Sequence, residues 1–328
     1  MQYVSLGRSG LMVSRICIGG NSWGAAGRRA WAAFGEAESR PFFKRALDQG
    51  INFFDTADTY NEGESERIVG KCLLEYAARD EVVISTKAGM AMGDDPNNRG
   101  VGRKHLMASI DAALQRLGTD HIDIFQVHRL DAVTPIEEVM ETLTNAVRAG
   151  KVRYVGGSTM PAYKFAEMLT LADAKGYARP IAMQNLYSLL QREEELEMNR
   201  LCAEAGVGLI PYSPLARGVL AGNRDSKGEG GTTERAQKDS RAQDDDLFRP
   251  SDRRVVDQVV KIAARRGVKP TQVALAWCLA KPAMAAPIIG TTKPEYIDDA
   301  AAAVDLALTA TEIERLEKPY QFRVRTPA

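Results

Sequence analysis

The 328-residue sequence has no excess of charge of either sign, because 43 lysine and arginine residues balance 43 aspartate and glutamate residues. A broad nucleic-acid interface requires a basic surface, so the balance argues against a nucleic-acid partner and leaves room only for a local phosphate site. No apolar run approaches the length that spans a bilayer, and residues 1–10 are polar where a secretory signal needs an apolar core. We therefore expect no membrane partner and a cytoplasmic location.

Cysteine and histidine are scarce. The four cysteines, Cys17, Cys72, Cys202 and Cys278, form no C-x-x-C pair, which predicts free buried thiols in a reducing compartment. The three histidines, His105, His121 and His128, lack the spacing of zinc ligands. The sequence therefore predicts no dedicated metal site.

Short apolar segments alternate with amphipathic segments along the chain. An opening β-hairpin is expected from residues 3–6 and 11–13, and strands are expected at residues 15–18, 52–54, 82–85, 122–126, 152–155, 181–184, 207–210 and 286–289. Helices are expected near residues 39–49, 65–76, 104–116, 193–204, 253–265, 271–279 and 312–317, with others beginning near Pro135, Pro161 and Pro294.

Eight apolar strands that alternate with helices predict an α/β protein whose parallel sheet is covered on both faces. Eight such units close into a (β/α)8 TIM barrel, here with an N-terminal β-hairpin and extra C-terminal helices, and residues 1–328 are expected to form one domain. A doubly wound open sheet is the alternative, but no G-x-G-x-x-G follows any of the strands. Two long loops, residues 21–38 and 217–252, are expected at the C-terminal face of the barrel, where active sites lie.

Polar residues follow the ends of the expected strands and should point into one shared pocket. They are Asp55, Tyr60, Lys87, His128, Ser158, Gln184, Tyr212 and Ser213. Reduction of a carbonyl by hydride leaves an alkoxide that needs a proton, and a tyrosine with an ordinary pKa of about 10 gives one reluctantly. A neighbouring lysine ammonium stabilises the phenolate, an aspartate keeps that lysine charged, and a histidine orients the carbonyl. The set predicts Tyr60 as the proton donor, with Lys87, Asp55 and His128 around it.

The motifs that carry these residues resemble those of the aldo-keto reductase superfamily, in the branch of aryl-alcohol dehydrogenases and channel β-subunits. They are DTADTY at 55–60 with Gly63, Ser65 and Glu66, STK at 85–87, IDIFQVH at 122–128, QNLYSLL at 184–190 and YSPLARG at 212–218. The resemblance covers nearly the whole chain in order. It implies a (β/α)8 barrel with the catalytic tetrad Asp55, Tyr60, Lys87 and His128.

The resemblance also implies that NADPH or NADP+ is bound in an extended form without a Rossmann domain. Tyr212 would stack on the nicotinamide, Ser158 and Gln184 would bind its carboxamide, and Ser213, Leu215 and Gly218 would lie beside the pyrophosphate. Gly290, Thr291, Thr292 and Lys293 precede an expected helix and would bind the 2′-phosphate. The sequence departs from the family pattern at Thr159, where relatives often have asparagine, and at Tyr296 and Ala300 on the adenine side.

The substrate is expected to be a small molecule, an apolar aldehyde or ketone that is aromatic or bulky, because the first long loop is rich in aromatic residues. Trp23, Trp31, Met90 and Arg129 are the candidate pocket residues. Two other functions stay open at this point: a barrel aldolase with Lys87 as its Schiff-base nucleophile, and an NADP-binding, redox-sensing subunit with little turnover. The sequence also leaves open whether the protein forms a homo-oligomer.

Overall fold

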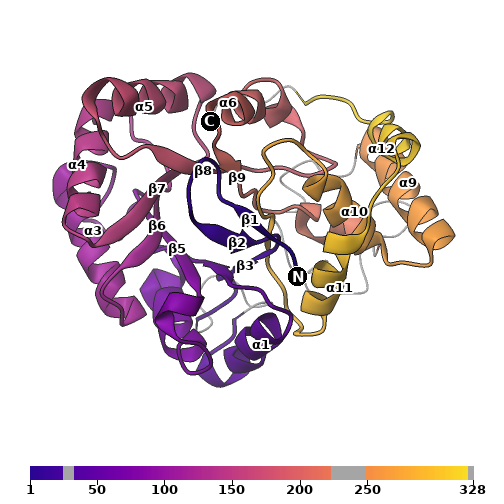
Figure 1. The fold of residues 1–328 in the computed structure, drawn as a ribbon, viewed down its shortest axis with the longest axis horizontal. Helices are drawn as coiled ribbons and strands as arrows, with labels where there is room; N and C mark the ends of the chain where they lie inside the picture. Colours follow the sequence, from indigo (N-terminus) through magenta and orange to yellow (C-terminus); the bar gives the residue numbers. More distant parts are fainter. Residues whose placement is uncertain (25–32, 223–248, 324–328) are drawn as a thin grey trace.

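The computed structural model describes residues 1–24, 33–222 and 249–323. Within them a curled sheet contains eight parallel strands: β3 (Cys17–Gly19), β4 (Phe53–Asp55), β5 (Val83–Ala88), β6 (Ile122–Val127), β7 (Val152–Ser158), β8 (Pro180–Gln184), β9 (Gly208–Leu209) and β10 (Ile288–Ile289). β10 pairs with β3, and Tyr212, just after β9, forms a parallel bridge with Ile288. The two ends of the sheet therefore meet, which confirms the (β/α)8 prediction (Figure 1).

Helices surround the sheet and bury its outer face. They are α1 (Glu36–Asp48), α2 (Glu64–Ile68), α3 (Arg103–Leu117), α4 (Ile136–Arg148), α5 (Ala162–Lys175) and α6 (Met198–Ala205). In α4 the buried residues Ile136, Val139, Met140 and Leu143 recur three or four positions apart, which gives the helix one apolar face toward the strands. Every residue of β5 and β6 is buried, as expected for strands covered on both faces.

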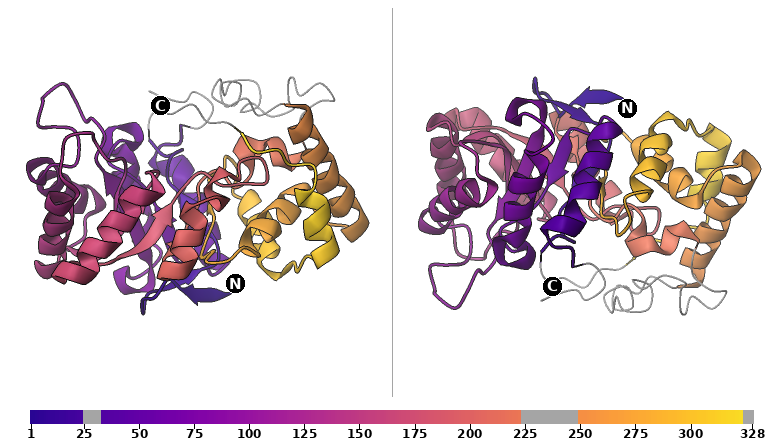
Figure 2. Two further views of the ribbon diagram at one scale, coloured as in Figure 1. Left: turned by 90° about the horizontal axis from the view of Figure 1, so that it is seen from above. Right: turned by 90° about the horizontal axis from the view of Figure 1, so that it is seen from below.

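The C-terminal part adds helices beyond the repeating units. They are α9 (Pro250–Arg266), α10 (Pro270–Leu279), α11 (Tyr296–Ala302) and α12 (Ala310–Glu317). They gather on one side of the molecule, next to β9 and β10, where the two ends of the sheet meet (Figures 1 and 2). The predicted extra C-terminal helices are thus confirmed.

The N-terminal hairpin, β1 (Tyr3–Ser5) and β2 (Met12–Ser14), closes one end of the barrel. Leu6 and Val13 pack with Phe53, Val83 and Ile124, which lie in the early parts of their strands. The backbone N–H of Arg8 also donates to the carbonyl of Gly206 at 2.8 Å, just before β9. Because this end is filled, the carboxyl ends of the strands are left to form the site.

Two predicted helices are interrupted. The helix expected at residues 65–76 is α2 followed by a wider, π-type turn, Val69–Leu73. At Gly70 a Cβ atom would lie only 2.0 Å from the carbonyl oxygen of Leu117, so the backbone there touches the end of α3 as only glycine allows. The helix expected at 193–204 is a short 3-10 turn, Glu193–Glu195, followed by α6.

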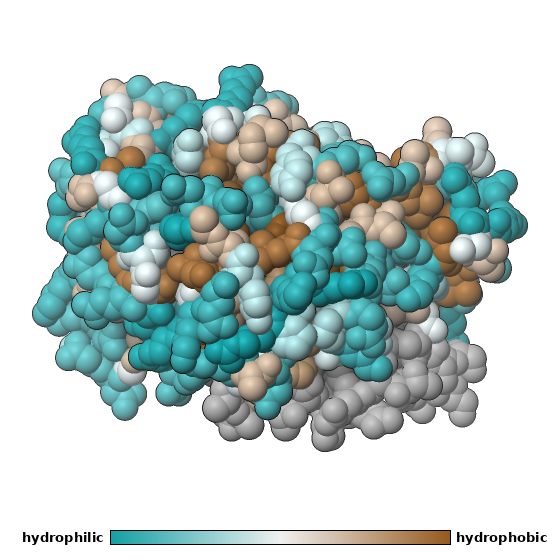
Figure 3. All heavy atoms as spheres, turned by 60° about the horizontal axis from the view of Figure 1, so that its bottom comes forward, coloured by the Kyte–Doolittle hydropathy of each residue, from teal (hydrophilic) through white to brown (hydrophobic). Residues whose placement is uncertain are grey.

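The face of the molecule in Figure 3 is mostly hydrophilic, with hydrophobic residues visible in patches and hollows between the polar ones. Over the residues that the structure describes, none of the helices combines the length and the apolar character needed to cross a membrane.

Candidate active site

The carboxylate of Asp55, at the end of β4, is the centre of the site. Its Oδ2 accepts a hydrogen bond from Lys87 Nζ at 2.6 Å, and its Oδ1 accepts from Gln184 Nε2 at 3.0 Å and from Gln126 Nε2 at 3.2 Å. Lys87, Gln126 and Gln184 come from β5, β6 and β8. Side chains of three other strands therefore meet on this carboxylate of β4, as expected where parallel strands end at one barrel mouth.

Lys87 is fully buried and makes a second contact, to the carbonyl oxygen of Thr56 at 2.7 Å. Burial alone would lower the pKa of Lys87, but the charge of Asp55 and the nearby Tyr60 more than offset it, so the pKa is raised from its ordinary value. The lysine is therefore a fixed positive charge. Its Nζ lies 5.0 Å from the centre of the Tyr60 ring.

Tyr60 opens a short 3-10 turn, Tyr60–Gly63, that follows β4. The turn is tight: Asn61, Glu62 and Gly63 have φ values of 49°, 57° and 85°. Such left-handed geometry is uncommon for residues other than glycine and tends to occur at functional sites. The turn holds the tyrosine ring against the end of β5.

His128 directly follows β6 and lies edge-on to Tyr60, with ring centroids 6.0 Å apart and planes at 81°. Burial, together with the positive charges of Lys87 and Arg129, lowers the pKa of His128 to about 3. The imidazole is therefore neutral near pH 7. Its Nδ1 is buried and has no hydrogen-bond partner among the described residues, so it is available to a bound molecule.

The residues expected at the nicotinamide lie on the next strands round the barrel. Ser158 ends β7, and its Oγ lies 3.4 Å from Thr159 Oγ1, which donates to the Tyr212 hydroxyl at 3.5 Å. Gln184 ends β8 beside Ser158 in register. One N–H of its amide is bonded to Asp55, so its oxygen and its second N–H remain for a carboxamide. Tyr212, Thr159 and Ser158 thus form a continuous polar edge.

The loop after Tyr212 bends sharply. Ser213, Ala216, Arg217 and Gly218 all have positive φ values, of 55°, 45°, 56° and 92°. The carbonyl of Leu215 accepts the backbone N–H of Gly218 at 2.9 Å, which closes the bend. Successive residues of this kind turn backbone N–H groups outward and can form an anion-binding concavity.

The segment after β10 contains the residues expected at the 2′-phosphate. Gly290 and Thr292 flank Thr291, whose hydroxyl donates to the carbonyl of Lys293 at 2.7 Å. The Lys293 side chain is exposed, and its ammonium lies 5.8 Å from the centre of the Tyr296 ring. In the described part of the chain the Lys293 ammonium has no acidic partner.

The expected substrate residues are spread out. Trp23 is 1% exposed and packs on Phe43 with ring centroids 4.4 Å apart, so its ring belongs to the core and not to an open wall. Met90 is 40% exposed, just after β5. Arg129 donates to the carbonyl of Thr159 at 3.3 Å, next to the tetrad. Trp31 lies outside the described residues.

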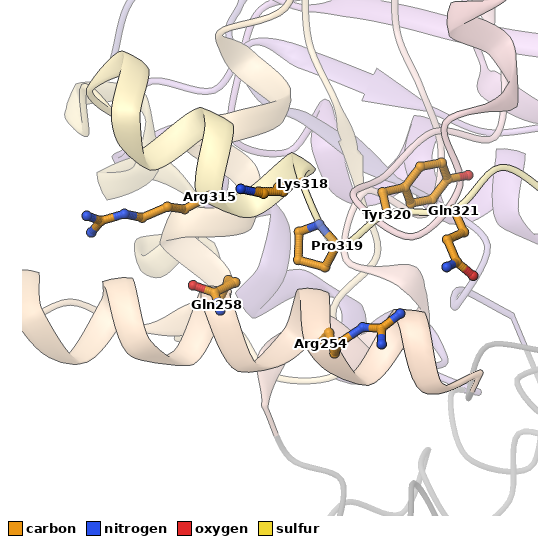
Figure 4. A pocket seen from close by; sticks show the side chains of 7 residues that line it. All are labelled: Arg254, Gln258, Arg315, Lys318, Pro319, Tyr320 and Gln321. Atoms are coloured by element: carbon orange, nitrogen blue, oxygen red, sulfur yellow. The ribbon is translucent and has the colours of Figure 1, made fainter.

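A separate hollow of about 400 Å³ lies between α9, α12 and the segment that follows α12. Figure 4 shows its lining residues: Arg254, Gln258, Arg315, Lys318, Pro319, Tyr320 and Gln321. The charged ends of Arg254 and Arg315 point in opposite directions, so the cations do not converge on one point. Within the residues that the structure places, no group of three or more histidine, cysteine or acidic side chains is arranged to hold a metal ion.

The model of the Aldo/keto reductase family matches residues 15–321 of the chain. The chain belongs to the aldo/keto reductase family. It is similar to the versiconal hemiacetal acetate reductase of Aspergillus parasiticus, at 40% identity over 98% of this chain and 97% of that protein. It is also similar to a putative aryl-alcohol dehydrogenase of Schizosaccharomyces pombe, at 38% identity over 97% and 95%, and to aldo-keto reductase dtxS3 of Metarhizium robertsii, at 38% over 98% and 91%.

Members of the aldo/keto reductase family generally use a nicotinamide dinucleotide, and the residues of this chain fit such a group. A carboxamide carries two N–H donors and one acceptor. The buried Oδ1 of Asn185, next to Gln184, has no hydrogen-bond partner among the placed residues, so it can accept such a donor. Ser158 and Thr159 supply hydroxyls at the end of β7, and the bend at 213–218 supplies backbone N–H groups.

The structure adds Gln126 and Asn185 to the residues expected from sequence. Gln126 lies two positions before His128, which directly follows β6, so alternation along the chain already predicted that both side chains point to the same side. Nothing in the sequence indicated that its amide reaches across to Asp55. Asn185 follows Gln184, and it is marked only by its buried Oδ1, which has no hydrogen-bond partner among the described residues.

Proposed function

We propose that this chain is an NADPH-dependent aldo-keto reductase that reduces an aldehyde or ketone to the alcohol, with Tyr60 as the general acid. The observation that carries the proposal is the buried Asp55–Lys87 ion pair, whose ammonium lies 5.0 Å from the Tyr60 ring centre. A permanent positive charge beside a phenol favours its ionised form and makes it a better proton donor near neutral pH.

In the proposed reaction Tyr60 gives its hydroxyl proton to the carbonyl oxygen, and the phenolate that remains is stabilised by Lys87. A bound reduced nicotinamide would supply the hydride that reaches the carbonyl carbon, which balances the addition of one hydride and one proton. Asp55 keeps Lys87 charged and in place through its 2.6 Å contact. His128, neutral because its pKa is depressed to about 3, would donate a hydrogen bond to the same carbonyl oxygen without competing for the proton.

Several residues would hold the cofactor. Ser158, Asn185 and the free oxygen of Gln184 would bind the carboxamide, and Tyr212 would stack on the ring. Ser213, Leu215 and Gly218 would lie beside the pyrophosphate. Lys293 favours NADPH over NADH, because an exposed ammonium without an acidic partner among the described residues can bind a 2′-phosphate.

The substrate is proposed to be an aromatic or bulky carbonyl compound. One of the similar proteins is named as a putative aryl-alcohol dehydrogenase, and another as a hemiacetal acetate reductase. Met90 and Arg129 lie at the ends of β5 and β6, where they can contact a substrate above the tetrad. An aldolase reaction is disfavoured, because a Schiff-base lysine must be neutral and Lys87 is held charged by Asp55.

The test is NADPH oxidation by the purified protein, followed by absorbance with a panel of aromatic and aliphatic aldehydes and ketones. Tyr60→Phe should lower kcat by on the order of 100-fold or more, because general acid catalysis is lost. Its affinity for NADPH should stay within about twofold, measured by quenching of protein fluorescence, since Tyr60 is not among the proposed cofactor residues. Full turnover by Tyr60→Phe on the best substrate would show that the assigned proton donor is wrong.

A further inference from the structure

Glu66 is a completely buried carboxylate that the proposed reaction does not use. Its side chain is 0% exposed and is bonded at both oxygens. Oε2 accepts from Arg116 Nε at 2.6 Å, and Oε1 accepts a short hydrogen bond from Thr86 Oγ1. Burying a charge of this kind is expensive unless it is paired and hydrogen-bonded. Both conditions are met here, so the position of Glu66 is tightly defined.

Glu66 and its partner Thr86 each lie close along the chain to a member of the tetrad. Thr86 directly precedes Lys87 in β5, and Glu66 lies in α2, which directly follows the 3-10 turn that begins at Tyr60. The Thr86–Glu66 hydrogen bond therefore joins the strand that carries the lysine to the segment that carries the tyrosine. A second link runs in parallel, because the backbone N–H of Asp58 donates to the carbonyl of Lys87 at 3.1 Å.

Arg116, in α3, forms the second contact of Glu66. Its side chain passes over Gly63, where a Cβ atom would lie 2.6 Å from Arg116 Cδ and 2.8 Å from its Nε. Gly63 also has a φ of 85°, a conformation that other residues rarely adopt. The end of the Tyr60 turn is thus shaped to admit the arginine that neutralises Glu66.

We propose that Glu66 is a positioning residue, which holds the Tyr60 turn against Thr86 and so fixes the separation of the Tyr60 hydroxyl from the Lys87 ammonium. The inference rests on the proposed function, in which that separation sets how readily Tyr60 gives its proton. A displacement of the order of 1 Å in a reacting group can cost about 100-fold in rate.

The test compares two variants that weaken the link with one that keeps it. Glu66→Gln removes the charge, Thr86→Val removes the hydroxyl but leaves the charge of Glu66, and Thr86→Ser keeps the hydroxyl. The first two should lower kcat by about tenfold or more, with KM for NADPH within about twofold, and Thr86→Ser should retain most of the wild-type kcat.

Asp123→Asn is the matched control. Asp123 pairs with Arg79 at 2.7 Å, and both partners are mostly buried, as in the Glu66–Arg116 pair. Asp123 also accepts the backbone N–H of Ile84 at 2.8 Å, but at the far end of β5 from Lys87. The melting temperature of Asp123→Asn should fall, as that of Glu66→Gln should, because each variant removes one partner of a buried ion pair. The kcat of Asp123→Asn should stay within about twofold of wild type.

A second readout needs no substrate. The ionisation of Tyr60 is followed as the ultraviolet phenolate absorbance that is lost in a Tyr60→Phe background. In Thr86→Val the midpoint should move upward, toward the ordinary value of about 10, because the phenol is no longer held beside Lys87. In Glu66→Gln the loss of a negative charge would by itself lower the midpoint, so an upward shift there reports position.

The inference is overturned if Thr86→Val and Glu66→Gln keep both kcat and the Tyr60 midpoint, or if Asp123→Asn loses kcat to the same extent. If the wild-type protein reduces no carbonyl in the panel, the proposed function fails by itself. The Tyr60 titration then still decides whether Glu66 fixes the tyrosine beside the lysine.

Discussion

The carboxylate of Asp55 and the ammonium of Lys87 form an ion pair that is shut off from solvent, with Oδ2 and Nζ 2.6 Å apart and the two side chains 2% and 0% exposed. Placing two charges in such a site costs desolvation free energy that their attraction only partly returns. The pair is thus a poor source of stability. The distance of 5.0 Å from Lys87 Nζ to the Tyr60 ring centre instead supports the proposed role of the pair, which is to make Tyr60 a better proton donor.

Removing one member of the pair should therefore destabilise the protein, while removing both should not. Lys87→Met leaves the Asp55 carboxylate buried without its cation, and we expect a loss of about 3–5 kcal/mol in the free energy of unfolding in urea. The double variant Asp55→Asn/Lys87→Met should recover most of that loss. Both should be inactive. If the double variant is as unstable as Lys87→Met, the pair stabilises the fold by itself.

His128 should act in its neutral form throughout the working range. Its pKa is lowered to about 3 by burial and by the charges of Lys87 and Arg129. His128→Gln should lower kcat by on the order of 100-fold, because the amide of glutamine does not place its N–H where the imidazole N–H would meet the carbonyl oxygen. The pH dependence of kcat between about pH 5 and pH 8 should keep its shape in that variant, because His128 itself does not ionise there. An acid limb near pH 6.5 that disappears in His128→Gln would contradict the neutral imidazole.

Asp58 should make the protein less stable as pH rises. Burial, and then the charge of Glu66, raises the pKa of Asp58 to about 7. Between about pH 4 and pH 7 the unfolded chain has lost this proton and the folded protein has not, so the free energy of unfolding falls as pH increases. Asp58→Asn removes the titration and keeps an oxygen for the backbone N–H of Thr59, which donates to Oδ1 at 2.6 Å.

Urea unfolding near pH 5 and near pH 8 measures this effect. The wild-type protein should lose on the order of 1–4 kcal/mol over the interval, and Asp58→Asn should lose clearly less. The exposed Asp94→Asn serves as the control for a general change in charge. Equal losses in all three proteins would show that Asp58 ionises normally in the folded state.

Lys293 should decide the choice between the two nicotinamide dinucleotides. Lys293→Met removes the charged contact to a 2′-phosphate, and KM for NADPH should rise by roughly 10- to 100-fold while KM for NADH stays nearly unchanged. Lys269→Met is a suitable control, because that lysine is also exposed but is paired with Asp299 at 2.8 Å. An equal effect on both cofactors would place the phosphate contact elsewhere.

The sequence by itself was sufficient to predict the barrel, since strands buried on both faces give short apolar runs and the helices between them have one apolar stripe. It also predicted that Asp55, Lys87 and His128 would share one mouth, because parallel strands all end on the same side. Their partners across the barrel were not predictable. Alternation along a strand tells which way a side chain points, but not which side chain from another strand it will meet.

Only the tertiary structure determined which side chains from different strands contact one another. It placed the amides of Gln126 and Gln184 on Asp55 and joined Glu66 to Thr86, contacts that span 71, 129 and 20 positions along the chain. It also buried Trp23 against Phe43. Composition and periodicity specify local shape and the direction of burial, whereas a hydrogen bond needs two atoms within about 3 Å, and only the closed barrel brings distant parts of the chain that near.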